Sequence, residues 1–233
     1  MTERFILVTH DDDGRDDSGS QHLLARGYAV DWTCPAQGGA LPSADDGYVG
    51  AIVYGGLHSV NDHATHDYLK TELAWIKDWV ARGKPFLGIC LGGQLLAHTS
   101  GAKIGPHPQG LHEYGYVEVT PTEAGRDLLP QAMHLYQAHT EGFDLPAGAE
   151  LLASSESYPH QAFRLNARTY GFQFHPEVTP QVMQRWLDWD TGNERMSKPG
   201  VHSRERQIAD AQRFNRAMSD WFTGFLDRWL AAE

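Results

Sequence analysis

The chain has 233 residues, 41% of them hydrophobic and 21% charged, which is enough to bury the core of one large α/β domain. Its formal net charge of −11 disfavours nucleic acids and anionic membranes as partners, because binding them requires a basic face. Two cysteines do not make a disulfide framework; a Cys34–Cys90 bridge would fit, but a reducing compartment is the better interpretation. Since no segment has the length of a signal-peptide core or a membrane span, we expect a cytoplasmic protein.

Strand-like and helix-like segments alternate through the first half of the chain. Expected strands lie at residues 5–8, 28–32, 50–54 and 86–89, and expected helices at residues 20–26, 67–82 and 91–100. In the helix at 67–82, Leu69, Leu73, Ile76 and Val80 recur at the spacing of one buried stripe. This alternation predicts a mostly parallel sheet with helices on both faces.

The second half of the chain is richer in strands, which predicts an antiparallel or mixed extension of the sheet. Expected strands lie at residues 115–120, 132–137, 150–154, 161–165 and 170–174. From Ser203 onward the pattern is helical, with one apolar face made of Ile208, Ala211, Met218, Phe222, Phe225 and Trp229. We therefore expect a main α/β domain over residues 1–190 and a helical extension over 191–233 packed on it. The segment Thr191–His202 is the expected flexible break between them.

Cys90 lies between two glycines at the junction of an expected strand and an expected helix. Residues 88–92 read Gly-Ile-Cys-Leu-Gly, the pattern of a nucleophile elbow with cysteine as the nucleophile. The sharp turn needs small neighbours and puts the sulfur at a helix N-terminus, where the dipole favours a thiolate. It also aims the Leu91 N–H at the position where an oxyanion would form. The alternative, that Cys90 is a small buried hydrophobic residue, leaves the paired glycines unexplained.

His175 and Glu177 are the candidates for the base and for the group that orients it, both of which a thiol nucleophile needs. A buried-type strand ends at His175, and the ends of parallel strands collect active sites. Pro176 bends the chain, so the Glu177 carboxylate can turn back to the imidazole. The competing interpretation is a chance histidine at a strand end, since the chain has 13 histidines. Others are interpreted as surface residues, among them His22, His63, His66 and His202.

Two segments resemble the signature segments of class I glutamine amidotransferases: GICLGGQLLA at residues 88–97 and GFQFHPEVTP at 171–180. Shorter resemblances lie at residues 54–57 (YGGL), 112–116 (HEYGY) and 138–141 (AHTE), the last as in relatives of the GMP-synthase type. The resemblance covers residues 50 to 180 or so and implies a flavodoxin-like, doubly wound mixed sheet flanked by helices. Two departures are Leu57, where the family has proline, and His139-Thr140-Glu141, which lacks the relatives' glycine and aspartate.

The resemblance also implies roles for individual residues. Cys90, His175 and Glu177 would form a catalytic triad that cleaves the γ-carboxamide of glutamine through a γ-glutamyl thioester. The N–H groups of Gly56 and Leu91 would form the oxyanion hole. Substrate-binding positions would be Gly55, Gln94, Glu113 and Tyr114. The alternatives are a helix-surface position for Gln94 and structural roles for Glu113 and Tyr114.

Three functions remain open. The first is a glutamine amidotransferase or amidohydrolase that works alone or supplies ammonia to a separate synthase subunit, since the chain carries no synthase domain. The second is a hydrolase of other γ-glutamyl peptides or amides, which the changed loop at Leu57 favours mildly. The third is a catalytically inactive binding protein. A cysteine-based α/β-hydrolase is disfavoured, because its acid precedes the histidine in the chain, whereas Glu177 follows His175.

Weaker patterns receive plainer interpretations. The chain has no P-loop, and the acidic residues 11–13 and 16–17 lack calcium-loop spacing, so we expect a solvated acidic loop, no cofactor and no metal. Cys34 is interpreted as structural. Four tryptophans are expected on buried helix faces: Trp186, Trp189, Trp221 and Trp229. A homodimer or partner contact, if one forms, is expected to use the C-terminal tail.

Overall fold

The computed structural model describes residues 2–12, 14–189 and 194–232. The strands are β1 (Arg4–Val8), β2 (Ala29–Thr33), β3 (Tyr48–Val53), β4 (Phe86–Ile89), β5 (Ile104–Pro106), β6 (Glu113–Pro121), β7 (Met133–His139), β8 (Glu141–Phe143), β9 (Glu150–Ser154), β10 (Ala162–Asn166) and β11 (Thr169–Phe172). The α-helices are α1 (Ser18–Ala25), α2 (Asp67–Ala81), α3 (Leu91–Thr99), α4 (Pro180–Trp189) and α5 (Arg204–Leu230). Short 3₁₀ helices are η1 (Pro35–Gln37), η2 (Val60–Ala64) and η3 (Glu194–Ser197).

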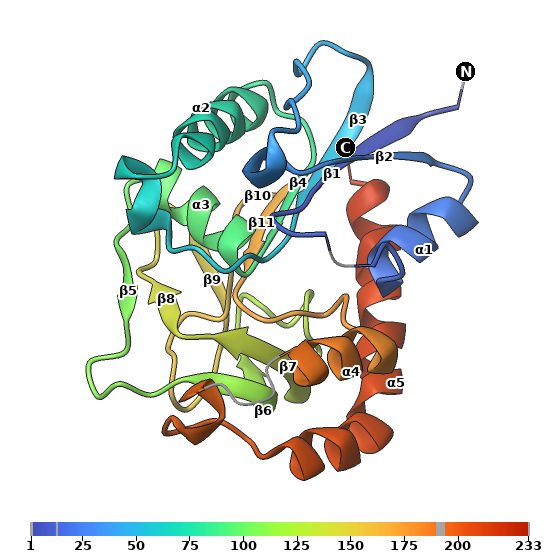
Figure 1. The fold of residues 1–233 in the computed structure, drawn as a ribbon. Helices are drawn as coiled ribbons and strands as arrows, with labels where there is room; N and C mark the ends of the chain where they lie inside the picture. The colour runs from blue at the N-terminus through green and yellow to red at the C-terminus, as the bar shows by residue number, and fades with distance from the viewer. Residues whose placement is uncertain (1, 13, 190–193, 233) are drawn as a thin grey trace.

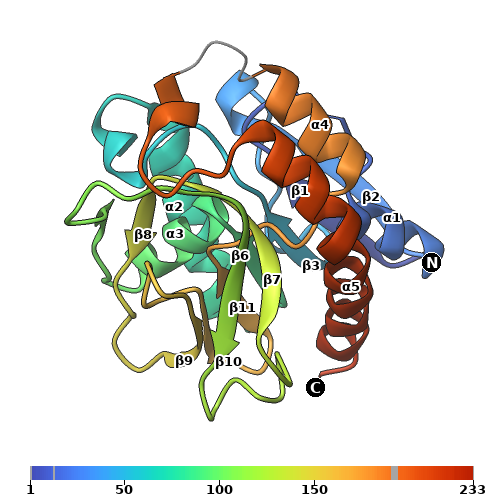
Figure 2. The same cartoon turned by 90° about the horizontal axis from the view of Figure 1, so that it is seen from below.

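Within the described residues, nine strands form one mixed sheet in the order β2-β1-β3-β4-β11-β10-β9-β6-β7. The strands from β2 to β11 run parallel, and those from β10 to β7 continue the sheet with antiparallel pairings. Helices α2 and α3 lie on one side of the sheet, and α1, α4 and α5 on the other (Figures 1 and 2). The predicted doubly wound, mostly parallel α/β fold with a C-terminal helix is confirmed.

Alternation along the parallel strands divides the apolar core between the two faces of the sheet. In β1, Phe5 and Leu7 join the core that contacts α5, whereas Ile6 and Val8 join the core under α2 and α3. Successive side chains of a strand point to opposite faces, so a sheet covered on both sides needs continuously apolar strands. This requirement explains why the strand runs were visible in the sequence.

Other features differ from the sequence-based expectations. The two-stranded sheet of β5 and β8 was not predicted, because three residues each, including Gly105 and Pro106, leave too short a pattern to read. Trp189 is 62% exposed, so the expectation that it lies on a buried helix face is wrong. Asp17 is buried rather than solvated; its carboxylate caps α1 at Ser20 and accepts a hydrogen bond from Tyr54.

The expected flexible break, Thr191–His202, falls partly on residues 191–193, which lie outside the described residues. Its later part is held by backbone hydrogen bonds, from the His112 N–H to the Pro199 carbonyl and from the His202 N–H to the Tyr114 carbonyl. Beyond it, α5 contacts α1, α4, β6 and β7 with the apolar face that the sequence predicted. We keep the division at residue 190 as a proposal. Among the described helices, none combines the length and apolar character needed to span a membrane.

Candidate functional site

The carboxyl ends of four neighbouring parallel strands meet at one place in the sheet. His10 follows β1, Gly55 follows β3, Cys90 follows β4 and His175 follows β11. In open α/β sheets this edge is where ligands bind. The candidate site is therefore assembled by the topology of the sheet from segments far apart in the chain.

Cys90 has the strained backbone of a nucleophile elbow. Its φ is 51° and its ψ is −107°, and it is the non-glycine residue with positive φ within the described part of the chain. The turn is tight because backbones approach closely at its glycines. A Cβ atom on Gly88 would lie 2.4 Å from the Gly92 carbonyl oxygen, and one on Gly92 would lie 2.1 Å from the Val53 carbonyl oxygen. The glycines are thus required by packing, and Leu91 begins α3 as expected.

His175 and Glu177 form a buried pair beside Cys90. The Nδ1 of His175 lies 2.8 Å from Oε1 of Glu177, and both side chains are at least nine-tenths buried. Burial disfavours the imidazolium, but Glu177 and Cys90 together outweigh it and raise the pKa of His175 to about 10. Within the described residues, Nε2 of His175 has no partner in hydrogen-bonding geometry, so this nitrogen is available for a reacting group.

Gly55 lies directly against His175 and beside Cys90, whereas Gly56 packs against His10 and Leu91. A Cβ on Gly55 would lie 2.6 Å from Cε1 of His175 and 3.5 Å from Cβ of Cys90. Only glycine therefore allows the loop to approach both side chains. Leu57, which follows, is 60% exposed and projects at the mouth of the site.

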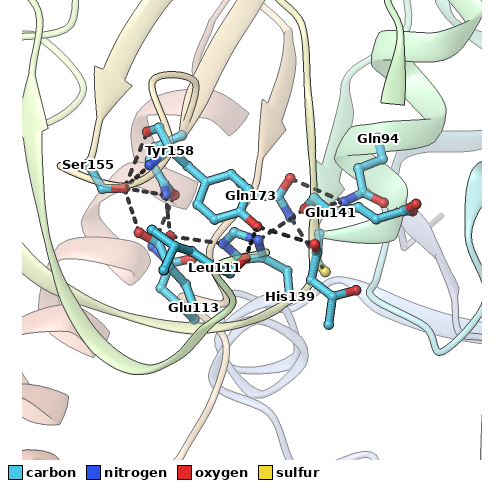
Figure 3. Close-up of polar contacts among 12 residues, drawn as sticks. Gln94, Leu111, Glu113, His139, Glu141, Ser155, Tyr158 and Gln173 are labelled. Atoms are coloured by element: carbon cyan, nitrogen blue, oxygen red, sulfur yellow. Dashed lines mark hydrogen bonds and ion pairs between the residues drawn. The ribbon is translucent and has the colours of Figure 1, made fainter. Parts of the chain in front are cut away.

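Gln94 is buried, not on the helix surface. Its amide nitrogen donates to the carbonyl oxygen of Glu141 at 3.0 Å and to Oε1 of Gln173 at 3.2 Å. Gln173 in turn donates to the Cys90 sulfur at 3.8 Å, so a chain of amides connects α3 with the sulfur (Figure 3). Gln173 was not singled out in the sequence, although it alternates with the buried aromatic residues that precede His175.

Glu113 lies behind the wall of the site, which corrects the expectation that it lines the substrate pocket. Its carboxylate accepts from the Ser155 hydroxyl and the Gln161 amide, both at 2.7 Å, and pairs with Nε2 of His139 at 3.0 Å (Figure 3). His139 does line the pocket, and so does Tyr114. The Glu113 contacts support the structural alternative for that residue.

A pocket of about 880 Å³ opens over these groups. Residues that line it include Tyr54, Gly55, Gly56, Leu57, Cys90, Gln94, Tyr114, His139, His175, Glu177, Trp186, Trp189 and Arg195. Asp17 also reaches it; burial, together with the nearby Glu177 carboxylate, raises the pKa of Asp17. Cys34 lies elsewhere, and both cysteines are free, so the Cys34–Cys90 bridge is excluded. Among the described residues, no group of three or more His, Cys, Asp or Glu side chains could hold a metal ion.

His10 and Glu72 were missed by the sequence analysis. They form a fully buried pair under the Gly55 loop, with His10 Nδ1 at 2.8 Å from the Gly55 carbonyl oxygen. A signal was present in α2, where the buried positions are Leu69, Glu72, Ile76 and Trp79. A glutamate on the apolar stripe of a helix needs a partner.

Comparison with known proteins agrees with this arrangement. Residues 21–189 match the sequence profile of the family described as glutamine amidotransferase class-I. The glutamine amidotransferase-like protein YfeJ of Salmonella typhimurium is 30% identical over 206 residues, covering 84% of this chain and 79% of YfeJ. A glutamine-hydrolyzing GMP synthase subunit of Ignicoccus hospitalis is 35% identical over 145 residues, covering 59% of this chain and 72% of that protein.

Longer relatives and solved structures extend the comparison. The GMP synthase of Aeropyrum pernix is 34% identical over 190 residues, covering 76% of this chain but only 34% of that protein. A solved glutamine amidotransferase of Thermotoga maritima superposes with a TM-score of 0.89 over 100% of both chains, at 24% identity. One of Methylobacillus flagellatus gives 0.91 over 99% of this chain and 95% of the other, also at 24% identity. The chain belongs to the class I glutamine amidotransferase family.

Proposed function

We propose that the chain hydrolyses the γ-carboxamide of L-glutamine through a γ-glutamyl thioester on Cys90, releasing glutamate and ammonia. The observation that carries the proposal is the strained Cys90 at the start of α3, beside a histidine whose other ring nitrogen is held by Glu177. Backbone strain at a site of this kind persists only where the surroundings enforce it, and here close glycine packing does so.

The geometry suggests how the reaction would proceed. His175 takes the thiol proton of Cys90 through Nε2, and Sγ attacks the γ-carbonyl carbon. The imidazolium, stabilised by Glu177, then gives the proton to the leaving nitrogen, and ammonia departs as the thioester forms. Water activated by His175 hydrolyses the thioester to glutamate. The N–H groups of Gly56 and Leu91 are the proposed donors to the oxyanion.

A second candidate is the hydrolysis of larger γ-glutamyl compounds. A pocket of about 880 Å³ is at the upper end of what a drug-sized ligand fills, and glutamine would occupy only part of it. The exposed Leu57 and Trp189 lie at its outer side, where a peptide or amide leaving group would extend. The acyl part of the reaction is the same for both candidates.

If glutamine is the substrate and the chain does not work alone, the ammonia passes to an acceptor. The chain spans about a third of the length of the GMP synthase from Aeropyrum pernix, and one relative is a separate GMP synthase subunit. We therefore propose that the partner in that case is a separate synthase subunit. A homodimer through the C-terminal tail stays a prediction, and an inactive binding protein is the least favoured alternative.

Glutamate release by the purified chain tests the proposal, with L-glutamine and a γ-glutamyl dipeptide as parallel substrates and Cys90→Ala as the control. Release from glutamine that Cys90→Ala abolishes supports the first candidate. Release from the dipeptide alone supports the second and overturns the first. If Cys90 does not react with a glutamine-like electrophile and neither substrate releases glutamate, the result would support the alternative of an inactive binding protein.

A further inference from the structure

A buried ion pair lies directly beneath the loop that carries Gly55 and Gly56. His10, on the loop after β1, places Nε2 at 3.1 and 3.0 Å from the two carboxylate oxygens of Glu72, on α2. Both side chains are fully buried. The pair does not line the pocket, so it touches no substrate, and the triad does not account for it.

Stability alone does not explain this pair. Glu72 occupies the buried stripe of α2 between Leu69 and Ile76, where an apolar side chain would pack. A buried ion pair is often no more stabilising than apolar residues of similar volume, because both charges lose their hydration. The pair is therefore better explained by what it holds in place.

The hydrogen bonds fix the protons of His10. The Gly55 carbonyl oxygen can only accept, so Nδ1 of His10 carries a proton and donates to it at 2.8 Å. A neutral ring would then present a lone pair to the Glu72 carboxylate, whereas the imidazolium donates to it. Burial works against the charged ring, but Glu72 outweighs burial and raises the pKa of His10.

The anchor determines where the next N–H points. The carbonyl and the N–H of a trans peptide point in opposite directions, and the described residues contain no cis peptide bond. With the Gly55 oxygen held by His10, the Gly56 N–H points away from the His10 ring, and Gly56 lines the pocket that contains Cys90. Two consecutive glycines leave this peptide free to rotate, so an anchor has a clear use.

We propose that His10 and Glu72 are positioning residues that orient the Gly55–Gly56 peptide so that its N–H completes the oxyanion hole. The proposal rests on the proposed thioester chemistry. It assigns the pair to a step that forms an oxyanion, and not to the reactivity of the cysteine itself. The rate of the oxyanion-forming step and the reactivity of the Cys90 thiol can be measured separately.

The experiment uses two double variants of the full chain. His10→Phe/Glu72→Leu replaces the ion pair by apolar groups and removes the donor to Gly55, while His10→Asn/Glu72→Leu restores a donor near the place of Nδ1. The control is His22→Phe/Asp227→Leu, which removes a partly exposed histidine–carboxylate pair between α1 and α5 that does not line the pocket. Each variant is assayed for kcat and KM on the substrate that the wild type hydrolyses, and for alkylation of Cys90 by iodoacetamide, which forms no oxyanion.

We expect kcat of the Phe/Leu variant to fall about 100-fold, the loss typical of one oxyanion donor, with KM within about threefold of the wild type. The kcat of the Asn/Leu variant should be about tenfold higher than that of the Phe/Leu variant, and the control should keep the kcat of the wild type. The rate of Cys90 alkylation should stay within about twofold of the wild-type rate in all variants. An unchanged kcat, equal losses in both His10 variants, or a parallel fall in alkylation would overturn the proposal. A wild type without turnover would instead overturn the proposed function.

A second measurement needs no variant. When glutamate γ-semialdehyde adds to Cys90 in the wild type, the thiohemiacetal oxygen lies where the oxyanion forms. The Gly56 amide proton should then move downfield in the NMR spectrum, because it gains a hydrogen bond. An unmoved Gly56 resonance with the adduct formed would overturn the proposal even if the variants failed to fold.

Discussion

The floor and the rim of the pocket are built in different ways. The floor, made of Gly55, Cys90 and His175, is held by close packing: a carbon added to Gly55 would meet the His175 ring, and one added to Gly92, two residues after Cys90, would meet the Val53 backbone. The rim, represented by Leu57 and Trp189, consists of side chains that are 60% and 62% exposed. Both regions surround the same pocket.

This difference separates the reaction that the site can perform from the leaving group that it can accept. The floor determines which reaction can occur, because the position of the sulfur and the imidazole depends on close backbone packing. On the proposed function, we expect the rim to contact only what extends beyond the γ-glutamyl group, so that its side chains can change without affecting the chemistry. We expect substitutions in the floor to cost far more free energy than substitutions in the rim.

The largest effect is expected for Gly92→Ala. The new Cβ would lie 2.1 Å from the Val53 carbonyl oxygen, and backbone cannot move aside as a flexible side chain can. We expect the free energy of unfolding to fall by about 3 kcal/mol, measured by denaturant titration. Gly105→Ala is the matched control, since no atom lies within 4 Å of its Cβ position. Equal stability of the two variants would refute the close packing of the floor.

The next effect is a pH-dependent stability due to His175. Because folding raises its pKa from 6.5 to about 10, the folded state binds more protons between these values. Its contribution to stability is therefore complete below pH 6.5 and is lost as the pH rises toward 10. The unfolding free energy of the wild type minus that of His175→Asn should shrink over this window by a few kcal/mol, since a shift of one pKa unit corresponds to about 1.4 kcal/mol.

Thermal or denaturant unfolding of both proteins from pH 6 to 10 measures this difference. The comparison removes the contribution of titrating groups that do not interact with His175, His10 among them, because both proteins retain them. A difference that stays constant or grows with pH would contradict the raised pKa of His175.

A smaller effect is expected at Cys90 itself. Its φ of 51° strains the backbone of any residue with a Cβ. Glycine relieves that strain, but it makes the unfolded chain more flexible, so folding loses more conformational entropy. We expect Cys90→Gly to unfold with a free energy about 1 kcal/mol higher than Cys90→Ala, since strain relief exceeds the entropy term. Denaturant titration of the two variants measures this difference, and a less stable Cys90→Gly would mean that the elbow is unstrained.

The smallest effect is expected at the rim. On the proposed function, Leu57→Ala should leave kcat unchanged and raise KM for a γ-glutamyl dipeptide by about threefold, with KM for glutamine unaffected. Leu24→Ala, at an exposed leucine of α1, is the matched control. A large fall in kcat for Leu57→Ala would show that the loop is part of the floor and remove the distinction between the two regions.

Much of the fold and part of the site could be predicted because the signals are local. The run Phe86–Ile89 followed by Gly-x-Cys-x-Gly contains a strand, a turn and a helix start within ten residues, and the structure has β4, the turn at Cys90 and α3 there. The nearness of His175 to Glu177 is likewise local, since they are two residues apart.

Local patterns were thus sufficient to predict most of the strands and helices along the chain and the residues that stand at the strand ends, because side-chain periodicity and glycine spacing act over a few residues. The three-dimensional arrangement was needed to show that His10 meets Glu72, that Gln173 reaches the Cys90 sulfur, and that Glu113 lies behind His139. These contacts join segments brought together by the strand order of the sheet, and no local pattern in the chain records which distant partner a buried polar group will find.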